Sequence, residues 1–274
     1  MRAVTPVVFP RSRGAEVGRR GQGKSVRWLG LVLFAITGLA AARAEAPPLR
    51  ICLLSASAEY ESDKSLAGFQ AYLEARYAVT CQRAFGKDKA VGLPGLEALD
   101  TADLMSVFTR RITLPPAQLE RVQKYIARGR PIIGLRTASH AFQNYLEFDR
   151  AVLGGGYVGH HTNAEAGVQL AAGRSQHPVL AGVSPFPTRK LYKNPTLADD
   201  VVVLLDGVTA SDREPVAWVR EQHGGRVFYT SLGTPEDFSQ ESFRRLLVNA
   251  IFWTTQRDEA ALRQPLSGGN RPSQ

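Results

Sequence analysis

The sequence predicts an α/β domain with a doubly wound, mostly parallel sheet and a β-rich C-terminal half. In the first half, apolar runs of strand length alternate with segments of helical spacing between residues 49 and 135. Buried strands separated by helices are typical of parallel sheets. In the second half, strand-like runs follow one another from residue 164 without a comparable helix until residue 239. The length that remains after a leader is removed suits one domain with a substantial core.

The first 44 residues have the pattern of a secretory signal peptide. Residues 2–27 are rich in Arg and Lys, the apolar run WLGLVLFAITGLAA follows, and Ala42-Arg43-Ala44 offers a cleavage site. The alternative is a membrane anchor, but this run is shorter than the roughly 20 residues that a spanning helix needs. We therefore expect cleavage after Ala44 and an exported protein, periplasmic or extracellular, with no stable membrane span.

The leader accounts for most of the positive charge. Of the 34 Lys and Arg and the 25 Asp and Glu residues, it holds eight and one, so the remaining chain has a net charge near +2. A balanced charge without a basic stripe gives no indication of a nucleic-acid partner. The sequence also lacks a cofactor-binding motif, so we expect no cofactor.

Two cysteines remain after the leader, Cys52 and Cys81, and both lie in apolar, strand-like runs. Export would permit a disulfide. Neighbouring strands seldom provide the geometry that a disulfide needs, however, and cysteine in such runs usually behaves as a small buried apolar residue. Two buried thiols are the favoured interpretation, and a disulfide stays the alternative.

The predicted elements of the first half follow in a regular order. A continuous apolar run is typical of a strand buried on both faces, and apolar residues three and four apart indicate a helix face. The predicted strands are 49–57, 78–85, 102–110 and 131–135, and the predicted helices are 62–77, with Ser62 or Asp63 as N-cap, and 115–128, opened by prolines and closed by Gly129.

The second half is predicted to hold four strands and a terminal helix. The strands are 164–173, 201–208, 214–222 and 225–233, with a tight turn at QHGG, and the helix is 239–256. The polar, Gly/Pro-rich end of the chain does not have the composition of a packed segment. We therefore expect a folded domain at 45–256 and a disordered tail at 257–274.

A strand–turn–helix elbow is predicted in RPIIGLRTASHAF, residues 130–142. In several α/β enzyme classes this turn presents a Ser or Cys nucleophile at the third residue from the glycine. Counting from Gly134, that residue here is Arg136. Arginine is cationic at any accessible pH and cannot attack a carbonyl.

This elbow resembles the G-x-C-x-G turn of class I glutamine amidotransferases, which have a flavodoxin-like sheet. More closely, the chain resembles the ThuA-like (trehalose utilisation) family of the same fold. AEYESDKSL, GLRTASHAF and LGGGYVGHH are similar to the family's pieces, and HPVLAGV, LYKNPTL, PVAWV, GRVFYTSLGTPEDF and NAIFW follow in order over about residues 48–256. The resemblance implies a flavodoxin-like, class I glutamine amidotransferase-like fold and a carbohydrate or sugar derivative as ligand.

The sequence departs from these families at two positions. Arg136 replaces the amidotransferase cysteine, and Thr234 stands where ThuA-like relatives commonly have His. Glu236 and Asp237 follow, but an acid without its His cannot orient a base as a catalytic triad does. We therefore predict no glutaminase activity, with Glu236 or Asp237 as acid/base or anchoring acid.

Arg136, His140 and His160 are expected to line one pocket at the carboxyl edge of the sheet, closed by the TPED loop, because open α/β sheets bind ligands at this edge. Arg136 would grip a ligand or else pair with a buried acid such as Glu59 or Asp237. His140 would act as acid or base or cap its loop. In GGGYVGHH the resemblance favours His160 over His161, and the glycines either admit a ligand or mark an irregular turn.

Glu59 and Tyr60, in the loop after the first strand, would contact the ligand or cap the first helix. A metal site from His140, His160 and an acid is a further alternative, although no spacing such as HExxH indicates one. The leading hypothesis is a protein that binds or processes a small-molecule ligand, a carbohydrate or sugar derivative. The alternative is a non-catalytic binding or scaffold module that kept the fold.

Overall fold

The computed structural model describes residues 47–161 and 165–264. The expected leader at 1–44 and residues 265–274 of the expected tail lie outside these ranges. The described residues belong to one compact unit. No helix among them is long and apolar enough to cross a membrane.

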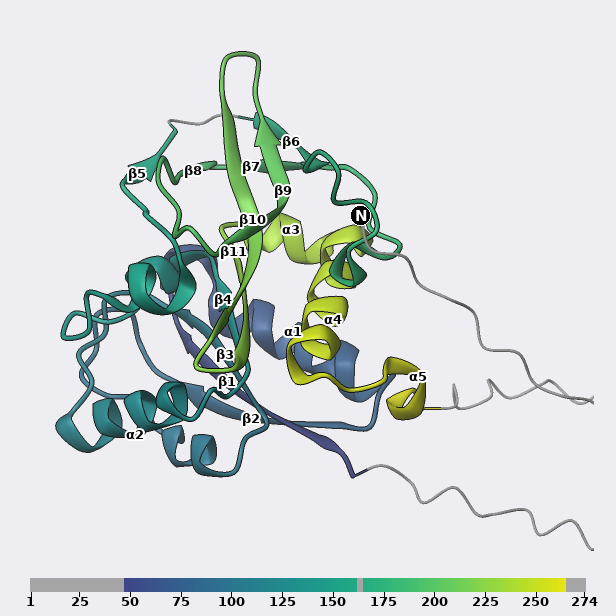
Figure 1. The fold of residues 1–274 in the computed structure, drawn as a ribbon. Helices are drawn as coiled ribbons and strands as arrows, with labels where there is room; N and C mark the ends of the chain where they lie inside the picture. Colours follow the sequence, from purple (N-terminus) through teal and green to yellow (C-terminus); the bar gives the residue numbers. More distant parts are fainter. Residues whose placement is uncertain (1–46, 162–164, 265–274) are drawn as a thin grey trace, which may run out of the picture. The chain divides into compact units, whose positions relative to one another are not determined.

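The domain is built on a mixed, mostly parallel sheet with helices on both faces (Figure 1). The strands are β1 (Leu49–Ala56), β2 (Val79–Phe85), β3 (Leu104–Thr109), β4 (Ile132–Leu135), β5 (Gly159–His160), β6 (Glu165–Leu170), β7 (Phe186–Arg189), β8 (Tyr192–Lys193), β9 (Val202–Val208), β10 (Arg213–Gln222) and β11 (Gly225–Thr230). The α-helices are α1 (Ser62–Glu74), α2 (Pro116–Ala127), α3 (Pro235–Ser239), α4 (Glu241–Thr255) and α5 (Glu259–Leu262). Shorter helical turns are η1 (Ala58–Tyr60), η2 (Leu96–Asp100), η3 (Arg136–His140), η4 (Phe148–Leu153) and η5 (Pro178–Leu180).

The nine-stranded sheet has the order β2-β1-β3-β4-β11-β10-β9-β6-β7. The strands from β2 to β11 pair in parallel, and from β10 to β7 each strand is antiparallel to the one before it. A separate ribbon is formed by β5 and β8. Because the parallel strands share one direction, the loops after β1, β3, β4 and β11 meet at one edge of the sheet.

Alternate side chains of the central strands enter two separate cores. Leu49, Ile51 and Leu53 face the core beneath α1 and α4. Cys52 and Leu54 face the core beneath α2 and η4. Side chains alternate across a strand, so a strand covered by helices on both faces must be mostly apolar; in the run LRICLLSA every residue except Arg50 is buried.

The cysteines are free and buried, which confirms the favoured interpretation. Cys52 belongs to the core beneath α2 and Cys81 to the core beneath α1 and α4. Although β1 and β2 are neighbours, the two thiols point to opposite faces of the sheet. This arrangement excludes a disulfide between them.

Two local expectations were wrong. Ser62 does not cap α1 from outside but is its first residue, and its hydroxyl accepts the Ser57 N–H at 2.9 Å. Residues 257–264, predicted to be tail, are ordered: α5 buries Leu262, and the Ala78 N–H donates to the Leu262 carbonyl at 2.6 Å. One buried leucine and backbone pairing with the residues just before β2 therefore extend the folded domain beyond residue 256.

Candidate functional site

The elbow predicted at Gly134 is present, and its backbone is strained. Arg136, the first residue of η3, has φ of 45°, a left-handed conformation that few non-glycine residues adopt. Gly134 is required because a Cβ there would lie 2.9 Å from both the Leu153 and the Tyr229 side chains. The following segment is a 3-10 turn rather than the α-helix expected from sequence.

The Arg136 side chain is used internally. It is 1% exposed, and its two Nη atoms donate to the Ser231 carbonyl at 2.7 Å and the Lys190 carbonyl at 2.9 Å. Its guanidinium lies between two tyrosine rings, 4.0 Å from the centre of Tyr60 and 4.6 Å from that of Tyr192.

This geometry corrects both interpretations of Arg136. The guanidinium cannot grip a ligand directly in this conformation because it is covered by its own neighbours. No ion pair joins it to an acid in the described part of the chain, including Glu59 and Asp237. Carbonyl oxygens and aromatic faces stabilise the charge instead. Arg136 therefore ties together the loops that follow β1, β4, β7 and β11.

His140 ends the elbow turn and is held as a neutral imidazole. Burial first, and then the positive charges of Arg111 and Arg110, lower its pKa to about 4. Its ring stacks on Tyr157 at 4.8 Å between centroids, and its Nδ1 lies 3.1 Å from the Ser139 hydroxyl oxygen. At neutral pH the ring can donate one hydrogen bond and accept another.

The two histidines of GGGYVGHH differ from expectation. His160 is exposed and makes no side-chain hydrogen bond with the described residues. His161 is the partnered one: its Nε2 lies 2.9 Å from a Glu214 oxygen, and its Nδ1 lies 3.8 Å from Asp212. Pairing of His160 with Tyr192 in the β5–β8 ribbon sends neighbouring side chains in opposite directions. Sequence reasoning missed Glu214 because it lies on β10, far from His161 in the chain.

Asp237 has a structural role that the sequence did not reveal. It is fully buried and completes a capping box with Thr234 at the start of α3. One oxygen accepts the Gly233 and Thr234 N–H groups at 2.8 and 2.9 Å, and the other accepts the Thr188 hydroxyl at 2.9 Å. Because these bonds occupy both oxygens, Asp237 cannot serve as the acid or base that we expected.

Glu236, the neighbour of Asp237, is exposed at the carboxyl edge. Hydrogen bonds from its own backbone N–H and from Thr234 lower its pKa, so it is ionised at neutral pH. It lines a cavity of about 410 Å³ together with Glu59 and Tyr60. We call this the acidic cavity; its other lining residues are Glu61, Glu165, Arg189, Lys190, Thr234 and Pro235.

The structure thus brings together three of the predicted residues, Glu59, Tyr60 and Glu236, and places Arg136 directly behind Tyr60. Glu59 is partly neutralised by Arg110 at 3.6 Å and Lys190 at 3.9 Å. His140 lines a different cavity, of about 320 Å³, which we call the elbow cavity. The expectation of one pocket shared by Arg136, His140 and His160 was therefore wrong.

Left-handed backbone conformations gather around these two cavities. Seven non-glycine residues of the described chain have a positive φ, and four of them, Glu61, Arg111, Arg136 and Lys190, lie here; the other three, Lys89, His223 and Gln256, line neither cavity. Each of the four lines one of the cavities or, in the case of Arg136, bonds to a residue that does. Such strain costs on the order of 1 kcal/mol per residue and tends to gather at functional sites.

Asp149 in η4 is a buried acid that sequence reasoning missed. It is 9% exposed, and burial raises its pKa to about 6. One oxygen accepts the Tyr157 N–H at 3.0 Å, which holds the tyrosine that stacks on His140. A Cβ at Gly155 would lie 2.2 Å from the other oxygen. The glycines of LGGGY thus serve close packing, at least at this position, rather than the approach of a ligand.

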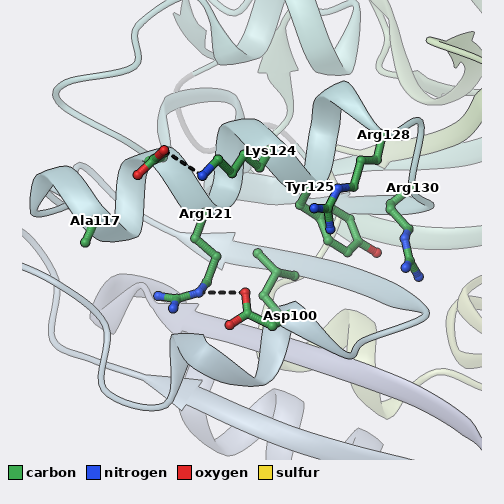
Figure 2. Close-up of a pocket in the computed structure, with 9 residues that line it drawn as sticks. Asp100, Ala117, Arg121, Lys124, Tyr125, Arg128 and Arg130 are labelled. Atoms are coloured by element: carbon green, nitrogen blue, oxygen red, sulfur yellow. Dashed lines mark hydrogen bonds and ion pairs between the residues drawn. The ribbon is translucent and has the colours of Figure 1, made fainter.

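A further cavity, of about 220 Å³, lies between α2 and η2. Figure 2 shows its charged side chains, of which Arg121 pairs with Asp100 at 2.8 Å and Lys124 with Glu120 at 2.6 Å. The neighbouring Arg130 bonds to the Ala102 carbonyl, which precedes β3. This cavity is therefore near the amino ends of the strands, away from the edge where open α/β sheets bind ligands.

The parts of the chain that the structure describes contain no candidate metal site. No group of three or more His, Cys, Asp or Glu side chains there could hold a metal ion. His140 and His160 in particular do not converge on a common acid.

Comparison with known proteins agrees with this fold. The model of the ThuA family, described as trehalose utilisation, matches residues 50–254. A ThuA-like protein of Bacteroides uniformis is similar in structure, with a TM-score of 0.60, 19% identity and coverage of 82% of this chain and 98% of that one. A ThuA-like protein of Parabacteroides merdae has a TM-score of 0.58, 16% identity and coverage of 76% and 90%. At these identities the structures show the fold alone, and no curated protein sequence matches. The family match covers most of the chain, which therefore belongs to the ThuA family.

Proposed function

We propose that this protein is exported and binds or processes a carbohydrate or sugar derivative in the acidic cavity, without glutaminase activity. The main observation in support is the cavity of about 410 Å³ at the carboxyl edge. Its lining includes both carboxylates and the cations Lys190 and Arg189. Sugar hydroxyls both donate and accept hydrogen bonds, so carboxylates and cations side by side suit them. The volume lies in the range of small-molecule sites. The family description of trehalose utilisation agrees with such a ligand.

Within this proposal the residues have distinct roles. Glu236 accepts hydrogen bonds from the ligand, and Glu59 and Tyr60 orient it from the opposite loop. Arg136 acts behind the surface by fixing Tyr60 and the Lys190 backbone. We also assign the sheet to the doubly wound, flavodoxin-like class, because the parallel order β2-β1-β3-β4-β11 with helices on both faces matches that class.

The lack of glutaminase activity rests on the two thiols as well as on Arg136. Burial raises the pKa of Cys52 and of Cys81 to about 12, so both stay protonated. The thiolate is the nucleophilic form of cysteine. Both residues also lie within strands rather than at the elbow.

A second candidate function is a non-catalytic binding module. It is favoured by Asp237 and Arg136, whose polar atoms are committed to internal bonds, and by the lack of any histidine among the residues that line the acidic cavity. The His161–Glu214 pair at 2.9 Å favours an enzyme instead, because it joins a potential base to an orienting acid.

The test is a calorimetric screen of neutral mono- and disaccharides, including trehalose, followed by sugar acids. For a sugar that binds, Glu236→Gln is expected to weaken affinity about tenfold, since a hydrogen bond to a charged group contributes about 1.5–3 kcal/mol. Glu120→Gln on α2 is the matched control and should bind normally. Equal affinity of wild type and Glu236→Gln would remove the acidic cavity as the site.

A further inference from the structure

The elbow cavity differs in chemistry from the acidic cavity. It has a volume of about 320 Å³ and is formed by residues that follow β3 and β4 at the carboxyl edge. Its lining residues are Arg111, Ser139, His140, Ala141, Phe142, Gln143, Tyr145, Leu146 and Phe148. Arg111 is the one permanently charged side chain in this list, whereas the acidic cavity has four glutamates.

Arg111 has no carboxylate partner among the described residues. It is exposed, and its side chain enters no ion pair or hydrogen bond with them. The neighbouring Arg110 is by contrast paired with Asp88 at 3.0 Å and with Glu59 at 3.6 Å. The Arg111 backbone is anchored, because its N–H donates to the His140 carbonyl at 2.9 Å. A cation held in place without a counter-ion can accept an anionic ligand.

The electrostatic environment of His140 reports a positive field in this cavity. Burial is the largest cause of its lowered pKa; in addition, the charges of Arg111, Arg110 and Arg136 lower this pKa, and Glu59 opposes them. A field that disfavours a proton on His140 favours an anion in the same place. When Nδ1 accepts the Ser139 hydroxyl, which lies 3.1 Å away, the neutral imidazole carries its proton on Nε2 and can donate that one hydrogen bond to the anion.

The rest of the cavity is apolar and aromatic. Leu146 is 76% exposed, and Phe148 contacts Phe142 and Tyr145 with ring centroids 5.0 and 5.7 Å apart. A large exposed leucine beside an aromatic cluster is a natural contact for the apolar body of a ligand. The volume is at the lower end of the range for small-molecule sites, which favours a small body such as a single ring.

We propose that the elbow cavity is a second binding site, distinct from the acidic cavity, for a small organic carboxylate with an apolar or aromatic body. Arg111 binds the carboxylate, the Nε2–H of His140 donates a hydrogen bond to it while Ser139 holds Nδ1, and Leu146 and Tyr145 contact the body. In this proposal the elbow turn, which lacks a nucleophile, contributes residues that bind a ligand.

The proposal can be tested by NMR titration of the protein at pH 7 with benzoate, with benzyl alcohol as the uncharged probe. Benzoate is expected to shift the Leu146 methyl and His140 ring signals with saturation, and benzyl alcohol to bind at least about tenfold more weakly. Arg111→Gln should weaken benzoate about tenfold or more, and Arg128→Gln, an exposed arginine on the α2 side, should not.

Arg111→Gly provides a second variant, because glycine adopts the left-handed φ of 50° at this position without strain. It should lose benzoate binding while its melting temperature stays near that of the wild type. Equal affinities for the two probes, or full benzoate binding by both Arg111 variants, would overturn the proposal. Glu236→Gln should leave benzoate binding unchanged, so failure of the sugar site and failure of this site are distinguishable.

Discussion

The guanidinium carbon of Arg136 lies 4.0 Å from the centre of the Tyr60 ring, and this contact joins the elbow to the loop after β1. The same guanidinium bonds to backbone carbonyls of Ser231 and Lys190. An arginine in place of a nucleophile has thus become a structural link at the carboxyl edge. It positions Tyr60 and Lys190, which line the acidic cavity.

Arg136→Met is expected to destabilise the fold strongly. It keeps apolar volume but removes both hydrogen bonds from a charged donor, each of which contributes about 1.5–3 kcal/mol. We expect the free energy of unfolding, measured with urea, to fall by roughly 3 kcal/mol. The exposed Arg128→Met is the control and should change it by less than about 0.5 kcal/mol. A similarly small effect at position 136 would contradict the structural role.

Arg136→Cys is expected not to restore glutaminase activity. The new thiol would stand at the elbow, but Thr234 replaces the histidine and Asp237 is occupied in the α3 capping box. Without a base to deprotonate it, the cysteine stays a poor nucleophile. Ammonia release from glutamine should remain at background for both wild type and variant. Release by the wild type would show that the elbow assignment is wrong.

Substitution of the adjacent acids Asp237 and Glu236 should affect stability to very different extents. Asp237→Ala removes the carboxylate that accepts the Gly233 and Thr234 N–H groups, and we expect about 2 kcal/mol of lost stability because those buried donors lose their acceptor. Glu236→Gln, one residue away and exposed, should change stability by less than about 0.5 kcal/mol. Thermal unfolding measures both. Equal losses of stability in the two variants would show that the capping-box hydrogen bonds of Asp237 do not stabilise the fold.

The pH dependence of stability should reveal Asp149 and His140 as opposing groups. Asp149 has a pKa of about 6 in the folded protein and 3.8 in the unfolded chain. Its contribution to folding stability is therefore complete below pH 3.8 and is lost as the pH rises through 6. His140 has a pKa of about 4 in the folded protein and 6.5 in the unfolded chain. Its contribution to folding stability is complete above pH 6.5 and is lost as the pH falls through 4. Between about pH 4 and 6, the two groups therefore change the stability of the wild type with pH in opposite directions and offset each other.

Single substitutions should uncover each slope. In Asp149→Asn, stability should rise with pH between 4 and 6.5, and in His140→Gln it should fall between 3.8 and 6, compared with the wild type. Urea unfolding at several pH values measures both effects. Parallel profiles for the wild type and both variants would contradict the opposing shifts.

Processing of the leader is a separate prediction. We expect cleavage after Ala44, so that N-terminal sequencing of exported protein begins at Glu45. Substitution of Ala44 by a large residue should block this cleavage, because the site requires small side chains at its −1 position. Recovery of the intact leader in the membrane fraction would indicate an anchored protein instead.

The sequence by itself determined most of the fold. Runs such as LRICLLSA and PIIGL are mostly apolar, as strands covered on both faces must be, and the inward residues of α4, from Phe243 to Ile251, repeat at helical spacing. These signals are local, so they can be read without knowing the neighbours. The glycine turn and the unreactive Arg136 at the elbow were also visible at this level.

The tertiary structure alone decided what the site residues contact. Asp237 and Glu236 are adjacent and chemically alike, yet one is fully buried in a capping box and the other faces the acidic cavity. His161 rather than His160 meets an acid, because that acid, Glu214, arrives from a distant strand. Burial and long-range pairing depend on how separate segments pack, and a local pattern does not contain that information. For the same reason Asp149, which holds the Tyr157 N–H, and Arg111, whose charge adds to burial in lowering the pKa of His140, were recognised only in the folded chain.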